Sequence, residues 1–73
     1  MLADWHTRHD RNGFPLERAT LGTFDLAVAF VGGEWQWLLR GDGRDLAEGA
    51  ERAELAAQLA AEQAAVRLGV GQP

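Results

Sequence analysis

The sequence predicts an α+β fold, an antiparallel sheet of three to four strands packed by one C-terminal helix. Two stretches carry this prediction. Residues 24–39 alternate bulky apolar side chains with small or polar ones on either side of a Gly-Gly pair, which is typical of a β-hairpin. Residues 51–68 contain strong helix formers and neither Gly nor Pro. At 73 residues the chain has room for one small domain, 1–73.

The central hairpin is expected over residues 23–31 and 34–40, and the alternation predicts its register. A two-residue turn at Gly32-Gly33 is favoured because glycine adopts positive φ without steric cost. Closing the turn there matches apolar residues on one face and opposite charges on the other. The predicted pairs are Phe30 with Trp35, Val28 with Trp37, Leu26 with Leu39 and Asp25 with Arg40. Trp35 and Trp37 are thereby assigned to the core.

The segment before the hairpin, 1–22, is expected to form a strand or an irregular hairpin. Asn12-Gly13 is a turn dipeptide, and a two-residue turn there pairs Arg8 with Glu17. This register gathers three apolar side chains on one face: Trp5, Phe14 and Leu16.

The segment after the hairpin completes a β-meander over 23–50. Residues 45–50 form a third strand, and a four-residue loop before it would set Leu46 opposite Leu39. The helix follows over 51–68, with acidic residues in its first turn and Arg67 in its last, as the helix dipole favours. Residues 69–73 form a tail.

The helix has two different faces at 100° per residue. One is a broad small-residue face, and the other is a narrow stripe of larger apolar residues, Leu55, Leu59 and Val66. Small residues would let the helix approach the bulky aromatic face of the sheet closely. The reverse docking, with the leucines inward, is the alternative.

The side-chain inventory argues against covalent catalysis. Cys, Ser, Lys and Tyr are all absent, and three Thr residues are the only hydroxyl-bearing side chains. We therefore expect no enzymatic activity and no cofactor. His6, His9 and Asp10 are the only plausible metal cluster, but on a strand the two histidines point to opposite faces. No metal site is expected.

The charge balance indicates the kind of partner. The chain has seven Arg, eleven acidic residues and a net charge of −4, which disfavours nucleic acid as a direct partner. A protein with a basic surface fits better. The N-terminus lacks an apolar leader and no apolar run is long enough to span a bilayer, so we expect no membrane partner and a cytoplasmic location.

Two candidate binding regions follow. Acidic residues recur at every third position and would form an acidic edge facing the partner, namely Asp42, Asp45, Glu48, Glu51 and Glu54. The alternative is that these acids only keep the surface solvated and interact favourably with the helix dipole. A self-interface that makes a homodimer is the second candidate, formed by Leu55, Leu59, Val66 and Trp5. Trp5 is either a lid on the sheet or an exposed interface anchor.

Residues 19–68 resemble small open reading frames of phages and prophages in GC-rich bacteria. The similarity lies in three segments, ATLGTFDLAV, EWQW and DLAEGA, followed by an Ala-rich helix. It implies a ββα-type fold and carries no binding residues. Several phage proteins of this size and acidity are anti-CRISPR inhibitors. The resemblance therefore implies an inhibitor that occludes a basic, nucleic-acid-binding surface of a type I CRISPR surveillance complex in the host cytoplasm. The alternative is a small structural or oligomerising protein with a helix-mediated self-interface.

Overall fold

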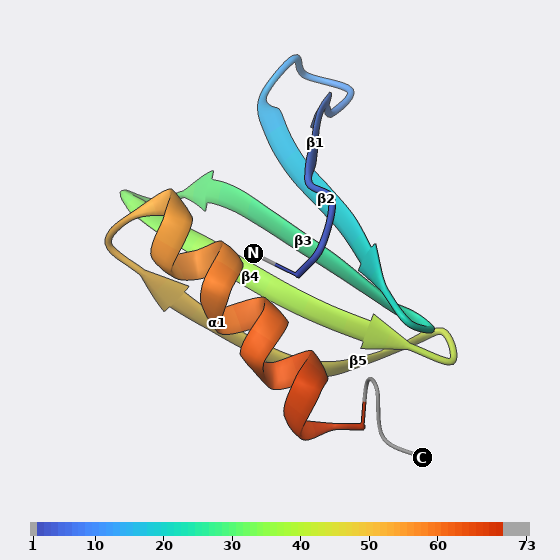
Figure 1. The fold of residues 1–73 in the computed structure, drawn as a ribbon. Helices are drawn as coiled ribbons and strands as arrows, with labels where there is room; N and C mark the ends of the chain where they lie inside the picture. Colours follow the sequence, from blue (N-terminus) through green and yellow to red (C-terminus); the bar gives the residue numbers. More distant parts are fainter. Residues whose placement is uncertain (1, 70–73) are drawn as a thin grey trace.

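The computed structural model describes residues 2–69 as one antiparallel sheet with a single helix across it (Figure 1). The α+β class is confirmed, but the sheet has five strands, in the order β1-β2-β3-β4-β5, where three to four were expected. Apart from Gly69, the expected tail at 69–73 lies outside the described residues. The elements are β1 (His6–His9), β2 (Pro15–Leu21), β3 (Phe24–Val31), β4 (Glu34–Gly41), β5 (Arg44–Glu51) and α1 (Glu54–Arg67).

The central hairpin, β3 and β4, has the predicted register. Gly32 and Gly33 form the turn with φ of 62° and 84°, which is the left-handed region that glycine tolerates. All four predicted pairs are present: Phe30 with Trp35, Val28 with Trp37, Leu26 with Leu39 and Asp25 with Arg40. The rings of Phe30 and Trp35 also contact each other, with centroids 5.0 Å apart.

The N-terminal hairpin, β1 and β2, differs from the predicted register by one residue. Arg8 pairs with Leu16, and Thr7 pairs with Glu17. The cause is Asp10, whose carboxylate accepts hydrogen bonds from the backbone N–H groups of residues 12 and 14, both at 2.9 Å. This side chain supports a longer turn than the two-residue one predicted. Leu16 pairs with Ala29 of β3 and so lies on the face opposite to that of the core, whereas Trp5 packs against the core. Because of the one-residue slip, the two residues do not share the expected face.

The connection from β4 to β5 is also tighter than predicted. Asp42 and Gly43 form a two-residue turn with φ of 54° and 72°, instead of a four-residue loop. Asp tolerates this left-handed conformation better than most residues. The register then shifts after Arg40, so that Ala47, and not Leu46, lies opposite Leu39. Leu46 is the extra residue of a β-bulge in the edge strand.

The helix docks through its small residues, as one of the two alternatives proposed. Leu26 and Leu39 of the sheet are fully buried against it, and its own buried apolar residues are Ala57, Ala61, Ala64 and Ala65. It begins at Glu54, three residues later than expected, because Glu51 is still paired in β5 opposite Trp35. The N-cap residue, Ala53, is extended and makes no side-chain capping bond.

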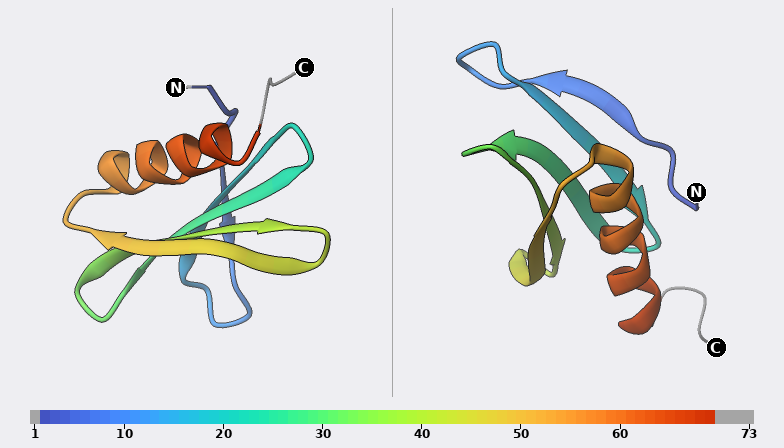
Figure 2. Two further views of the ribbon diagram at one scale, coloured as in Figure 1. Left: turned by 90° about the horizontal axis from the view of Figure 1, so that it is seen from below. Right: turned by 90° about the vertical axis from the view of Figure 1, so that its left-hand side faces the viewer.

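The helix covers only one face of the sheet. It contacts β3, β4 and β5, and Figure 2 shows it lying on one side of the strands. No other element within residues 2–69 packs on the opposite face, which we call the open face. Alternate residues of β3 and β4 therefore have different environments, since Leu26 and Leu39 are buried while Ala27 and Leu38 are half-buried.

Candidate binding surfaces

The acidic edge follows β5, which pairs on one side only, with β4, in the described part of the chain. The five acids do not share one direction. Asp42 lies in the turn before the strand, Asp45 and Glu48 lie on the open face, Glu51 shares the helix-covered face with Trp35, and Glu54 begins α1. The structure thus brings the five acids onto one border of the sheet but not into a single ridge.

The border carries most of the net charge of the protein. Residues 42–54 contain five acids and two Arg residues, and so account for three of the four net negative charges. One acid is already paired, since Arg40 Nε donates to Asp45 Oδ1 at 2.8 Å. Both side chains of this pair are at least half exposed, so the pair contributes little to stability.

The proposed self-interface is divided by the structure. Leu55, Leu59 and Val66 remain on the outer side of α1, with 55%, 39% and 37% of their surface exposed. Trp5 does not join them as an exposed anchor. It is half-buried and packs against the core, and its indole Nε1 donates to Glu62 at 2.8 Å. The structure therefore makes Trp5 a fixed lid.

Glu62 is a structural residue that sequence reasoning missed. It is only 2% exposed, and its carboxylate accepts hydrogen bonds from the backbone N–H groups of Leu2 and Ala3, both at 3.0 Å, and from Trp5. Burial alone would raise the pKa of Glu62, but these three donors outweigh it and lower the pKa below its ordinary value. The only signal in the sequence was an acid within a helix face of apolar residues.

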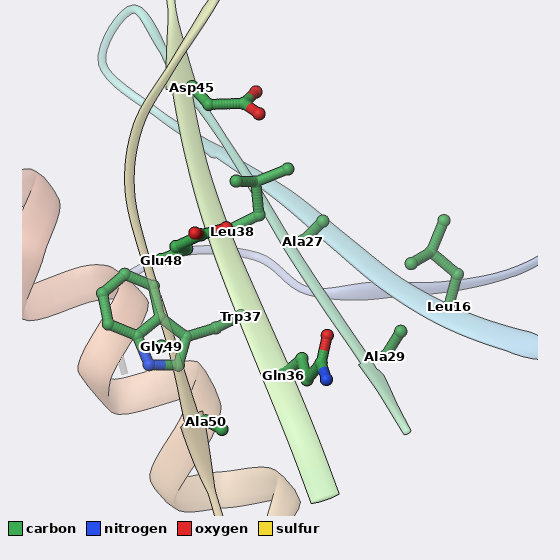
Figure 3. A pocket seen from close by; sticks show the side chains of 10 residues that line it. All are labelled: Leu16, Ala27, Ala29, Gln36, Trp37, Leu38, Asp45, Glu48, Gly49 and Ala50. Atoms are coloured by element: carbon green, nitrogen blue, oxygen red, sulfur yellow. The ribbon is translucent and has the colours of Figure 1, made fainter. Parts of the chain in front are cut away.

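The open face contains a second cluster that sequence reasoning missed. The paired residues of successive strands place five side chains in one row across the sheet, because directly opposed residues share a face. A shallow hollow on this face exposes the apolar middle of the row and the neighbouring Ala29 (Figure 3). The row runs from β1 to β5 as His6, Arg18, Ala27, Leu38 and Glu48.

The residues considered for metal binding do not converge. His6 and His9 lie at alternating register positions of β1, so they point to opposite faces. His6 Nε2 lies 3.4 Å from Asp4, and both side chains are exposed. Asp10 is engaged in its turn. Among residues 2–69 no group of three acidic or histidine side chains is placed to hold a metal ion.

The chain matches no protein-family model, no curated protein and no solved structure. The resemblance to small phage reading frames thus depends on the sequence pattern of residues 19–68 alone. Within the described residues, α1 is the only helix, and it is too short and too polar to cross a bilayer.

Proposed function

We propose that this chain is a non-enzymatic binding protein that uses the acidic edge along β5 to contact a basic surface on another protein. The observation that supports it most directly is the placement of charge. Three of the four net negative charges lie in residues 42–54, along a sheet border that no described element covers. Complementary charge of this kind accelerates association and selects partners more than it adds affinity.

The border is better suited to side-chain contacts than to strand addition. A peptide that extends the sheet needs a regular, uncharged edge with free backbone groups. Here the bulge at Leu46 interrupts the edge, and acids recur along it at Asp45, Glu48 and Glu51. The partner surface is therefore expected to meet carboxylates and not a row of backbone hydrogen bonds.

The concrete form of the proposal is an anti-CRISPR-like inhibitor in the host cytoplasm. The nucleic-acid channel of a CRISPR surveillance complex is basic, because it must neutralise phosphates. Carboxylates spaced along a β-strand compete for the same Arg and Lys side chains. Binding would thus prevent recognition of DNA by occlusion, without any chemical step.

The test combines capture and inhibition. The purified protein, immobilised through an N-terminal tag, is expected to retain a type I surveillance complex, and the free protein is expected to reduce DNA binding by that complex. Failure of both assays with the complexes of GC-rich bacteria would overturn the inhibitor form of the proposal.

A matched pair of variants tests the edge itself. Neutralising three acids outside the open face, in Asp42→Asn/Glu51→Gln/Glu54→Gln, is expected to weaken binding about tenfold and to reduce its salt dependence. The control, Asp4→Asn/Glu17→Gln/Asp25→Asn, changes the net charge equally at other places. Equal losses in both variants would show that net charge, and not the edge, governs binding.

A second candidate, an oligomerising protein, is favoured by the outer side of α1. A globular helix normally turns its larger apolar residues inward. Here Leu55, Leu59 and Val66 point outward while alanines face the sheet. If this stripe joins two copies, Leu59→Glu should convert a dimer to a monomer in sedimentation experiments.

A further inference from the structure

The first described residues of the chain are attached to α1 through one side chain. Residues 2–5, which we call the N-terminal strap, run from the start of β1 to the side of α1 (Figures 1 and 2). The three hydrogen bonds that join the strap to α1 all end on the carboxylate of Glu62. Its Oε1 accepts the backbone N–H of Leu2 at 3.0 Å, and its Oε2 accepts the backbone N–H of Ala3 at 3.0 Å and the indole N–H of Trp5 at 2.8 Å.

The sheet does not hold the strap. β1 begins at His6, which pairs with Arg18, so no strap residue belongs to a strand. Leu2 is exposed, and the side chain of Asp4 points into solvent, 3.4 Å from His6. Among residues 2–5, only Trp5 packs against the hydrophobic core. The attachment of the strap therefore depends on two side chains, the indole of Trp5 and the carboxylate of Glu62.

The bonds to Glu62 depend on its charge. An ionised carboxylate accepts hydrogen bonds at both oxygens, whereas protonation makes one of the oxygens a donor. Hydrogen bonds to a charged acceptor are also stronger than those between neutral groups. Because Glu62 is only 2% exposed, water cannot replace the donors while the strap stays in place. Protonation of this one carboxylate therefore weakens all the hydrogen bonds between the strap and α1.

The surroundings of Glu62 contain no ion pair that would hold its charge instead. From α1, Arg67 lines the same surface hollow, but within residues 2–69 no cationic side chain forms an ion pair with Glu62. From the strap, Asp4 points away toward His6. From the sheet, the side chains packed beneath α1 are hydrophobic. Burial raises the pKa of Glu62, but the strap's three donors, with a smaller effect of the chain's amino terminus, lower it below the ordinary value.

We propose that the N-terminal strap is a lid that is released as a unit when Glu62 loses its charge, while the sheet and α1 stay folded. Release breaks no strand pairing and no backbone hydrogen bond of α1. Segments with few buried contacts typically open separately from the rest of a fold. The inference goes beyond the proposed function, because it does not involve the acidic edge.

Release of the strap uncovers apolar surface beside α1. Trp5 packs against the cluster that contains Leu26, Leu39 and the buried alanines of the helix. Leu2 lines a hollow with Leu59 and Val66 on the outer side of α1. Without the strap, this part of the core and the outer side of the helix would form one continuous apolar surface. The strap therefore controls how much apolar surface the helix presents.

An acid titration of the full chain by nuclear magnetic resonance tests the proposal. The reporters are the backbone amides of Leu2 and Ala3 and the indole N–H of Trp5. Their signals should shift together with one midpoint below 4.5, because the charged form of Glu62 favours the attached strap. Below this midpoint their protection from hydrogen exchange should fall about tenfold, which corresponds to one lost hydrogen bond. The amides of β3 and β4 should stay protected.

Two outcomes of the titration would overturn the proposal. Strap reporters that stay protected below their midpoint would mean that Glu62 does not hold the strap. Loss of protection in the strap and in β3 and β4 at the same pH would show that the whole fold opens together.

Variants test the same release at neutral pH. Glu62→Gln should lower the protection of the strap reporters about tenfold and raise the fluorescence of the dye ANS, with unchanged circular dichroism. Trp5→Phe, which keeps a ring but removes one donor, should have a smaller effect. The control, Glu17→Gln, makes the same substitution at an exposed acid bonded to Thr7 and should change neither reading. A strap that stays protected in Glu62→Gln would contradict the proposal.

Discussion

The two faces of the sheet are built from the same strands and have opposite chemistry. On the covered face, Leu26, Val28 and Leu39 are at most 1% exposed, and Leu26 and Leu39 pack beneath the alanines of α1. On the open face, the alternating residues of the same strands form rows that are small in the middle and charged at the sides. The difference indicates that one face holds the fold together, while no described element covers the other.

The largest expected effect is the removal of a core side chain. Leu39→Ala should lower the free energy of unfolding by about 2–5 kcal/mol, because Leu39 is fully buried and its loss leaves a cavity. Its sequence neighbour is the control. Leu38→Ala on the open face should cost less than about 1 kcal/mol in the monomer. Urea denaturation at low protein concentration measures both, and equal losses would erase the distinction between the two faces.

A second effect tests how closely the covered face is packed. A Cβ added at Gly49 would lie 2.6 Å from Trp37 Nε1, so Gly49→Ala requires the indole ring to move. We expect a loss of about 1–3 kcal/mol in thermal or urea unfolding. The adjacent Ala50→Ser on the open face should change stability by less than about 0.5 kcal/mol. An unchanged stability in Gly49→Ala would mean that the ring can move freely.

A third effect concerns the hydrogen bonds that attach the N-terminal segment to Glu62 of α1. Glu62→Gln should cost about 1–2 kcal/mol, because a neutral amide replaces a carboxylate that accepts three hydrogen bonds. In the wild type the pKa of Glu62 is lowered in the folded state. The charged form therefore stabilises the fold above the ordinary value of 4.5, and this contribution is lost as the pH falls through the lower, folded-state pKa.

The measurement for Glu62 is urea unfolding of both proteins between neutral pH and acid. The stability difference between wild type and Glu62→Gln should shrink as the solution becomes acidic. Glu17→Gln, which alters an exposed hydrogen bond between Glu17 and Thr7, serves as the control. A difference that is independent of pH would contradict the assignment of a charged Glu62.

The smallest expected effect is a gain at the start of the helix. Ala53 occupies the N-cap with extended backbone angles and no side-chain bond. Ala53→Ser should supply an acceptor for a free backbone N–H and raise stability by about 0.5–1 kcal/mol. A matched Ala60→Ser within the helix should not stabilise it. No gain in the melting temperature of Ala53→Ser would show that the cap is already satisfied by solvent.

The sequence predicted the structure correctly in segments where one local conformation is clearly lower in energy than its alternatives. The register of β3 and β4 was predictable because Gly32-Gly33 favours a two-residue turn and both faces of the hairpin then match. The helix was predictable from its composition, although its start was placed three residues too early. The five candidate acids were assigned to one edge of the sheet. Which face each of them lies on depends on how β5 pairs with β4.

The tertiary structure decided the features in which alternatives have similar local energies. The side chain of Asp10 shifts the register of the N-terminal hairpin by one residue, and the bulge at Leu46 shifts the register of β5 against β4. The sequence did not decide which face of α1 docks on the sheet, because the alanine face and the leucine face are both apolar. Close approach to a sheet of bulky residues favours the alanine face. The hydrogen bonds from the N-terminal segment to Glu62, and the row of side chains across the open face, join residues that are distant in sequence. Only the folded sheet and helix bring these residues together.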